Sequence, residues 1–285
     1  MRHLYECPLR WADLDLLGHV NNVVYVDYLQ EARVDMMRTH APDDRADDLA
    51  EGVVVVRHEV SYLAPLEFRF HPVRVECWVT EVRAASFTMA YEIVDDGPHG
   101  RTTYLRAQTV LTPYVFATER PRRLSDNERD WLGRFLEPAE PVRRSSPAPL
   151  ARADQGHYAV HVRFSDVDVY GHVNNVKYFE YLQEGRIALL ARLAEGLPGV
   201  QPMRTVVAQT DVDYRVPILL RPEPYDLWSR VAHVGRTSMV VESEIRDGET
   251  LLSRARVVMV FWDPDTLQPS PPLAAYRERL VAALP

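Results

Sequence analysis

The stretch that decides the organisation of this chain is Arg10-Trp11-Ala12-Asp13-Leu14-Asp15-Leu16-Leu17-Gly18-His19-Val20-Asn21-Asn22. It recurs as Arg163-Phe164-Ser165-Asp166-Val167-Asp168-Val169-Tyr170-Gly171-His172-Val173-Asn174-Asn175. The match continues without a gap, and Tyr28-Leu29-Gln30-Glu31 has its counterpart in Tyr181-Leu182-Gln183-Glu184. Chance does not produce such a repeat, and its period is far longer than the roughly 20–50 residues of a solenoid unit. The sequence therefore predicts two copies of one domain in tandem.

The boundary between the copies is marked by a change in composition. Residues 137–149 are rich in proline and small polar residues, which favours an extended connector. A surface loop has the same composition, but a position between two repeats is typical of a linker. We therefore place domain 1 at residues 1–140, a Pro-rich linker at 141–155 and domain 2 at 156–285.

A helix is predicted directly after each copy of the motif. Apolar and aromatic residues then follow at spacings of three and four, which places them on one face of a helix about four turns long. In the first copy these are Tyr25, Tyr28, Leu29, Ala32 and Met36, and in the second Tyr178, Tyr181, Leu182 and Leu189. Short strands are predicted before each motif, at 5–11 and 158–164.

Four β-rich runs follow each helix, at 53–62, 73–82, 87–94 and 103–111 and at 205–214, 225–234, 238–245 and 254–261. Turn signals such as Asp247-Gly248 separate consecutive runs and favour an antiparallel meander. The long helix is the only element available to cover one face of that sheet. We therefore expect an α+β fold with a sheet wrapped round a central helix. Terminal helices are predicted at 125–136 and 273–284, the first capped by Ser125 or Asp126.

Composition and charge exclude several classes of protein. The chain has 46% hydrophobic and 26% charged residues, as globular proteins do, and its formal charge of -8 argues against nucleic acid as a partner. No apolar run approaches the roughly 20 residues of a membrane span. The two cysteines have no metal-ligand spacing and the N-terminus has no apolar signal core, so we expect a reduced, cytoplasmic protein.

The repeated motif, Asp-x-Asp-x-x-Gly-His-Val-Asn-Asn followed by a helix with Tyr-x-x-Tyr-Leu-x-Glu, resembles the hydroxybenzoyl-CoA thioesterase-like hotdog family. The long acyl-CoA hydrolases and the plant acyl-carrier-protein thioesterases have similar forms. The resemblance covers essentially the whole chain twice, although only the motif is specific. It implies two tandem hotdog domains, paired as an intrachain pseudo-dimer with acyl-thioester sites at their interface.

The chemistry of thioester hydrolysis fits a loop that leads into a helix. An activated water or nucleophile is needed, together with donors aimed at the carbonyl oxygen, and the first N–H groups of a helix lack intrahelical acceptors. The resemblance implies that Asp15 and Asp168 are catalytic and that the backbone N–H groups of Asn22 and Asn175 polarise the carbonyl. The alternative for an Asp before a helix is a cap or turn, and Asn21 and Asn174 are candidate caps. We interpret Asp13 and Asp166 as turn or strand-end residues.

Further residues of the motif are candidates for substrate or water positioning. They are His19 and His172, which can equally pack within the loop, and Tyr62 and Tyr214, which ordinary sheet packing explains equally well. Glu31 and Glu184 on the helices are interpreted as structural. A metal site is not expected, because one His and one Asp per loop are too few ligands.

The motif also departs from the plant enzymes, which have an Asn where this chain has Leu17 and Tyr170. Near the site, Val24 and Ala32 of the first copy are replaced by Lys177 and Gly185 in the second. We therefore expect the two pockets to be unequal.

The resulting hypothesis is a hydrolase of acyl-CoA, fatty rather than aromatic, that acts in lipid metabolism with no cofactor beyond the coenzyme A of its substrate. One alternative is an acyl-carrier-protein thioesterase, for which exposed arginines would hold the acidic partner. A second is a non-catalytic acyl-CoA-binding regulatory module, which the presence of both carboxylates disfavours. Because paired hotdogs commonly stack further, we expect two chains to form a homodimer.

Overall fold

The computed structural model describes residues 1–40, 52–98, 100–139, 150–200, 204–263, 265–266 and 268–285. The chain divides into two compact units, Met1–Arg144 and Ser145–Pro285. Each unit has the α+β architecture that the repeat predicts, and the pairing of the units into a pseudo-dimer stays a prediction.

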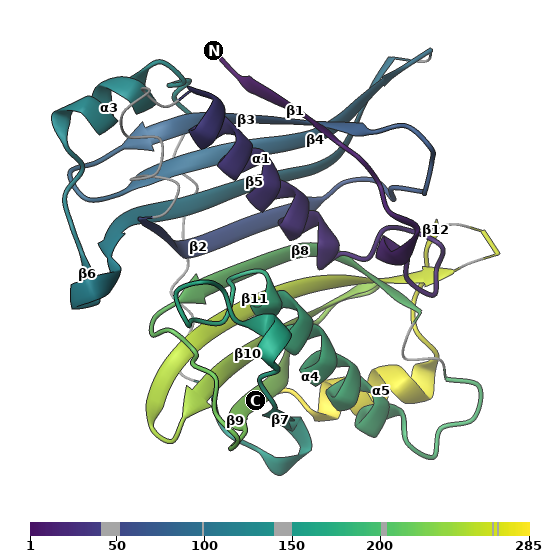
Figure 1. Ribbon diagram of the computed structural model, residues 1–285. Helices are drawn as coiled ribbons and strands as arrows, with labels where there is room; N and C mark the ends of the chain where they lie inside the picture. Colours follow the sequence, from purple (N-terminus) through teal and green to yellow (C-terminus); the bar gives the residue numbers. More distant parts are fainter. Residues whose placement is uncertain (41–51, 99, 140–149, 201–203, 264, 267) are drawn as a thin grey trace. The chain divides into compact units, whose positions relative to one another are not determined.

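In unit 1, an antiparallel sheet with the order β1-β3-β4-β5-β2 is covered on one face by the helix α1, Val24–His40 (Figure 1). The strands are β1 His3–Cys7, β2 Val53–Tyr62, β3 Val73–Val82, β4 Phe87–Gly97 and β5 Gly100–Val115. A two-residue strand, β6 at Arg120–Pro121, pairs with the end of β5.

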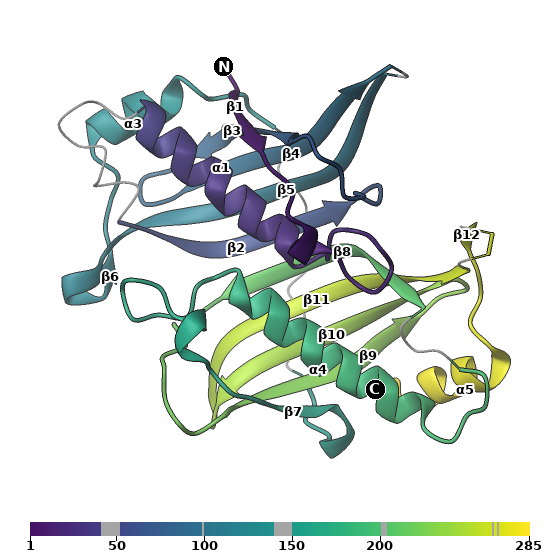
Figure 2. The same ribbon diagram turned by 45° about the vertical axis from the view of Figure 1, so that its right-hand side comes forward.

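Unit 2 repeats this plan, with the order β8-β11-β10-β9-β7 under the helix α4, Lys177–Ala194 (Figure 2). Its strands are β7 His157–Val160, β8 Thr205–Tyr214, β9 Tyr225–Val234, β10 Ser238–Asp247 and β11 Thr250–Asp263. The short β12, Gln268–Pro269, pairs with β11 as β6 pairs with β5.

The four strands predicted after each helix are confirmed, but the prediction of a simple meander is wrong for the first of them. β2 pairs with β5, and the place beside β3 is taken by β1. β3 and β4 are joined by the short segment 83–86, whereas residues 63–72 between β2 and β3 are long enough to cross the sheet. On the way, the Leu66 carbonyl accepts a hydrogen bond from Val20 of the motif, at 2.8 Å.

The strands predicted before the motifs are shorter than expected. β1 ends at Cys7 and β7 at Val160, and Trp11–Asp13 and Phe164–Asp166 form 3₁₀ turns instead of strand. The prediction was wrong for these last residues, because a carboxylate at the end of each turn accepts backbone and side-chain hydrogen bonds that a sheet cannot supply.

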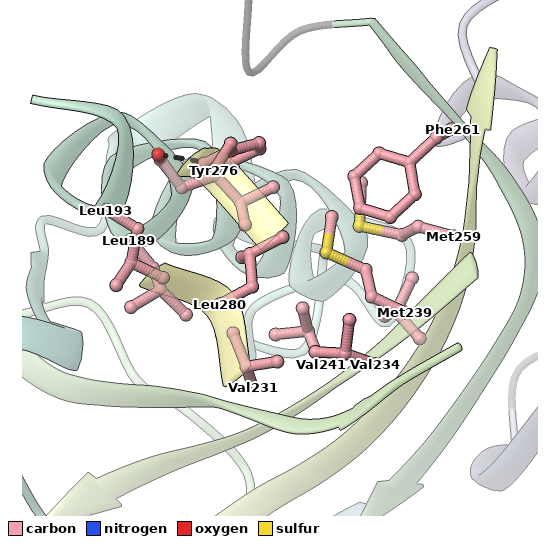
Figure 3. Packing of buried hydrophobic residues seen from close by; sticks show 12 residues of the cluster. Leu189, Leu193, Val231, Val234, Met239, Val241, Met259, Phe261, Tyr276 and Leu280 are labelled. Carbon is pink, nitrogen blue, oxygen red and sulfur yellow. Dashed lines mark hydrogen bonds between the residues drawn. The ribbon is translucent and has the colours of Figure 1, made fainter. Parts of the chain in front are cut away.

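Both predicted terminal helices are present. α3, Asp126–Gly133, begins with a capping box in which Ser125 Oγ accepts from Glu128 N–H at 3.2 Å and the Glu128 carboxylate accepts from Ser125 N–H at 2.7 Å. α5, Ala274–Ala282, places Tyr276 and Leu280 on a cluster built from α4, β9, β10 and β11 (Figure 3). Of the described helices, none has the length and apolarity needed to cross a membrane.

The helix faces predicted from spacing are the buried ones. Leu29, Ala32 and Met36 have no exposed surface, and Leu182 has 2%. On β3, the thiol of Cys77 lies under α1, and burial raises its pKa to about 12. These residues belong to the cores that join each central helix to its sheet.

The predicted linker falls mostly on residues 141–149, which lie outside the described residues. Its last part is in contact with unit 2. Leu150 is buried and donates its N–H to Glu244 at 3.3 Å, and Arg152 forms an ion pair with Glu249 at 2.8 Å. Residues 150–155 therefore belong to unit 2.

Candidate active site

In unit 1, the motif folds into a small hairpin immediately before the helix. Leu14 and Val20 form its closing bridge, and the N–H of Asp15 donates to the carbonyl of His19 at 2.8 Å. The turn needs Gly18, whose φ of 78° is in the left-handed region. Asp15 is half-buried, and its Oδ1 accepts the N–H of Leu17 at 2.8 Å.

Unit 2 repeats this geometry with different side chains. Asp168 N–H donates to His172 carbonyl at 2.8 Å, and Gly171 has a φ of 80°. The Oδ1 of Asp168 accepts the N–H of Tyr170 at 2.9 Å and that of His172 at 3.3 Å. The two motif aspartates therefore hold the turn through the same oxygen atom.

The turn uses only one oxygen of each carboxylate. Within the described residues, Oδ2 of Asp15 and Oδ2 of Asp168 accept no hydrogen bond from the protein. A carboxylate fixed through one oxygen and open at the other is oriented and can still take a proton or attack a carbonyl carbon. The turn function that we weighed as an alternative is thus observed, and its geometry is compatible with a catalytic role for the same carboxylate.

The first aspartate of each pair has a different role. Asp13 is 4% exposed, and its carboxylate accepts from Arg10 N–H at 3.2 Å, from Arg10 Nε at 3.0 Å and from the hydroxyl of Tyr28 at 2.6 Å. Both carboxylate oxygens thus accept hydrogen bonds from within the unit. Asp13 therefore joins the loop to the second turn of α1, as the turn interpretation predicts.

In unit 2, Asp166 is fully buried and accepts from Tyr181 Oη at 2.7 Å and from Arg163 N–H at 2.9 Å. Burial by itself raises the pKa of this carboxyl, but the hydrogen bonds from Tyr181 and Arg163 together with the Arg163 charge outweigh it, so the pKa is lowered. Asp166 is thus an ionised structural anchor.

The start of α1 presents an open donor beside this loop. Asn21 N–H donates to Asp13 carbonyl at 2.8 Å, Asn21 carbonyl accepts from Val24 N–H at 2.9 Å, and Asn21 Oδ1 accepts from Val23 N–H at 3.2 Å. In a trans peptide the N–H of Asn22 points opposite to the Asn21 carbonyl, away from the helix. Among the described residues it has no acceptor. The capping prediction for Asn21 and the N–H prediction for Asn22 are geometrically compatible.

Asn174 organises the start of α4 in the same way. Its N–H donates to Asp166 carbonyl at 2.9 Å, its carbonyl accepts from Lys177 N–H at 2.9 Å, and its Oδ1 accepts from Val176 N–H at 3.2 Å. Asn175 follows at the position of Asn22, and its amide donates to Asn174 Oδ1 at 3.2 Å.

Tyrosines from the sheet and the helix fix this segment. Tyr62 Oη donates to Asn22 carbonyl and Tyr214 Oη to Asn175 carbonyl, each at 2.9 Å. Tyr25 Oη accepts from Leu66 N–H at 3.2 Å, and its ring lies edge-on to that of Tyr62 at 5.5 Å. Sequence reasoning assigned Tyr25 only to the core face. Its repetition as Tyr178, which accepts from Ile218 N–H at 3.0 Å, was the signal for a polar role.

The remaining candidates named from the sequence are two histidines and two helical glutamates. His19 and His172 are half-buried, with backbone bridges to Glu67 and Leu219 that secure the hairpin. Glu31 and Glu184 are exposed on the outer side of their helices, which agrees with the structural interpretation.

The two copies differ around the helix start. In unit 2, Lys177 Nζ lies 2.6 Å from Glu180, which also pairs with Arg163 at 2.9 Å. Gly185 is packed against Leu227, since a Cβ there would lie 2.4 Å from Leu227 Cδ2. Unit 1 has Val24 and Ala32 at these positions, so the two central helices differ there. In the described residues, no three His, Cys, Asp or Glu side chains gather as a metal site.

A sheet that wraps a central helix, present twice, with a carboxylate loop at each helix start, defines a tandem hotdog protein. The sequence model of the Thioesterase-like superfamily matches residues 9–132 and 162–280. The chain therefore belongs to the thioesterase-like superfamily, and it is a thioester hydrolase of the hotdog fold. A relative in Bacillus subtilis (strain 168), the uncharacterised protein YsmA, is 37% identical over 106 residues, which are 35% of this chain and 68% of that protein.

Solved structures share the tandem fold. A protein from Lactobacillus plantarum named as an oleoyl thioesterase superposes with a TM-score of 0.73 at 14% identity, over 92% of this chain and 96% of its own. The 12:0-ACP thioesterase from Umbellularia californica gives a TM-score of 0.69 at 17% identity, over 91% and 93%. At these identities the similarity establishes the fold.

Proposed function

We propose that the chain hydrolyses fatty acyl-CoA to free acid and coenzyme A, with Asp15 and Asp168 as base or nucleophile. The observation that carries this proposal is the same in both units. The loop fixes one oxygen of the carboxylate and leaves the other open, close in sequence and in the hairpin to the helix start.

The reaction follows from these groups. As base, the carboxylate takes a proton from water while the hydroxide oxygen bonds to the thioester carbon, and the carbonyl oxygen becomes negatively charged. The N–H of Asn22 or Asn175, with the positive end of the helix dipole, stabilises that charge. The carbon–sulfur bond then breaks, and the thiolate needs little help because a thiol pKa is only about 8.5.

The carboxylate can alternatively attack the carbon itself and form an anhydride that water opens. A single turnover in ¹⁸O-labelled water separates the routes. With a base, the label enters the fatty acid directly. When water opens the anhydride at the aspartyl carbon, the fatty acid instead leaves with an unlabelled aspartate oxygen and the label stays on the aspartate. His19 and His172 are proposed to position the water or the substrate. Tyr62 and Tyr214 are proposed to act indirectly, because their hydroxyls hold the backbone carbonyls of Asn22 and Asn175 in place.

A turnover screen tests the proposed substrate. Acyl-CoA thioesters from short to long, aromatic acyl-CoA, and the same acyl groups on acyl carrier protein are compared by kcat/KM. We expect fatty acyl-CoA to be the best class. Preference for the carrier protein would move the assignment to an acyl-carrier-protein thioesterase, and binding of acyl-CoA without turnover would make the chain a ligand-binding module. The homodimer stays a prediction, which sedimentation at micromolar concentration tests.

A further inference from the structure

A cation lies inside unit 1 that the proposed reaction does not use. Arg33, on α1, is only 7% exposed, and its Nη1 is buried without a hydrogen-bond partner in the described chain. A guanidinium retains its charge in proteins, and a buried charge without a counter-ion is strongly unfavourable. A methionine of similar length would fill this place without that cost.

The neighbours of Arg33 are donors whose acceptors are weak. Tyr91 on β4 is 1% exposed. Its oxygen accepts hydrogen bonds from the Arg33 guanidinium and the Thr109 hydroxyl, and its own O–H donates to the Met89 sulfur at 3.6 Å. Burial raises the pKa of Tyr91, and the nearby Arg33 guanidinium and Thr109 hydroxyl oppose that rise. The thiol of Cys77 has the sulfur of Met36 at 3.6 Å. Among the described residues, Nη1 of Arg33 therefore has no acceptor, and the O–H of Tyr91 has the weakly accepting Met89 sulfur.

The polar chain continues across the sheet. Thr109 on β5 and His58 on β2 are fully buried and share a hydrogen bond of 2.9 Å between Oγ1 and Nδ1. A carboxylate near Cys77, that of Asp35, is engaged by His3 Nε2 at 2.9 Å. The interior under α1 therefore holds a fixed group of donors in an otherwise apolar core.

Unit 2 has a different interior at the corresponding positions of the ladder. Tyr91 pairs with Ala107, and its counterpart Ser243 pairs with Ala255. Ser243 shares a hydrogen bond of 2.8 Å with Ser229. The counterpart of Thr109 is Val257, which has no polar group. The second arginine, Arg186, therefore lacks the tyrosine and threonine of unit 1.

We propose that the interior of unit 1 binds a carboxylate at the far end of the acyl chain, with Arg33 and Tyr91 as donors. The substrates would then include thioesters of dicarboxylic acids, an inference that rests on the proposed function. A guanidinium and a phenol together match the acceptor sites of a carboxylate, and Arg is the preferred partner for that planar anion. The bound anion would neutralise the buried charge.

The distance from Asn22 to Arg33 predicts the length of the acyl chain. It lies eleven residues beyond Asn22, which is about 16 Å along the helix at about 1.5 Å per residue. An extended chain advances about 1.2 Å per bond, so about 13 bonds separate the thioester carbon from the distal carboxylate. Tetradecanedioic acid has this length, and it is the probe of choice.

Binding is measured first, because it does not depend on turnover. The thermal midpoint of the full chain is followed with tetradecanedioate, tetradecanoate, hexanedioate or acetate at equal concentration. We expect tetradecanedioate to raise the midpoint of the wild type by several degrees more than the other three acids. Arg33→Met should remove this difference, Tyr91→Phe should reduce it, and the matched variant Arg186→Met should retain it.

The unliganded variants provide a check on folding. Arg33→Met should melt no lower than the wild type, because it removes an unpaired buried charge. Equal shifts by tetradecanedioate and tetradecanoate would overturn the proposal, as would a difference that persists in Arg33→Met. An equal shift by acetate would show an adventitious anion only.

Turnover provides the second measurement. The ratio of kcat/KM for ω-carboxytetradecanoyl-CoA to that for tetradecanoyl-CoA should fall at least about tenfold in Arg33→Met and stay unchanged in Arg186→Met. If neither thioester is hydrolysed, the proposed function fails, and the melting experiment still decides whether the carboxylate site exists. If both thioesters are hydrolysed and the ratio of their kcat/KM values is the same in all variants, the proposed carboxylate site is refuted while the proposed hydrolase function stands.

Discussion

The hydroxyl of Tyr28 donates to Oδ2 of Asp13 over 2.6 Å and so ties the central helix of unit 1 to the loop that carries Asp15. Tyr181 and Asp166 repeat the contact at 2.7 Å. Both carboxylates are buried, and both accept from a backbone N–H three residues earlier. The first aspartate of each motif therefore fixes the loop that carries the second.

Tyr28→Phe tests this relationship because it removes only the hydroxyl. Losing a hydrogen bond to a buried charged group should lower the free energy of unfolding by about 1.5–3 kcal/mol. The loop should then be less well placed, so that kcat falls while KM changes little. Urea unfolding and steady-state kinetics on the same samples measure both. Tyr5→Phe, at a half-buried tyrosine on β1 outside the loop, is the control. An unchanged kcat would leave Tyr28 with a structural role only.

Asp166 predicts a pH dependence of stability. Its folded pKa is lowered, so its contribution to stability is fully present above the unfolded pKa of about 3.9 and is lost as the pH falls through the folded value. The difference in unfolding free energy between wild type and Asp166→Asn should therefore be large at neutral pH and shrink below about pH 4. Urea titrations from pH 3 to pH 7 give this difference. A difference in unfolding free energy that stays constant with pH would contradict the role of Asp166 as an ionised anchor.

The catalytic assignment predicts a pattern across three variants. Asp15→Asn and Asp168→Asn should each retain part of the acyl-CoA hydrolysis, in unequal shares, and the double variant should lose at least about 10²-fold. The amide can still accept the turn N–H through its oxygen, so folding should be preserved, which circular dichroism checks. Glu31→Gln, at an exposed helix position, is the control. A folded double variant with wild-type turnover would refute the assignment.

The 3₁₀ turn Asp154–Gly156 predicts a strict requirement for glycine. A Cβ on Gly156 would lie 1.9 Å from the carbonyl oxygen of Ser229, and this neighbour is backbone that cannot rotate away. Gly156→Ala should therefore lower the unfolding free energy by about 3 kcal/mol. Gly133→Ala, where a Cβ meets nothing within 4 Å, should be neutral or slightly stabilising. Thermal melts of the two variants provide the comparison, and equal midpoints would contradict the expected clash.

The sequence by itself determined the repeat, the helix faces and the eight strands that follow the helices. These depend on local periodicity, so Leu29, Met36 and Leu182 could be assigned to the core from spacing alone. It also singled out Asp15 and Asp168, because a doubled motif is informative without coordinates. The sequence did not determine the order of the strands, because β2 pairs with β5 through a crossover that hydrophobic alternation does not encode.

Only the tertiary structure decided which polar residues cooperate. Tyr62 meets the Asn22 carbonyl forty residues away in the chain, and Tyr28 meets Asp13 across the loop. Arg33 reads in the sequence as an ordinary residue on a helix, yet it is a buried cation with an unpartnered nitrogen. The physical reason is that hydrogen-bond satisfaction is a property of three-dimensional neighbours, whereas helix and strand periodicity is a property of the chain.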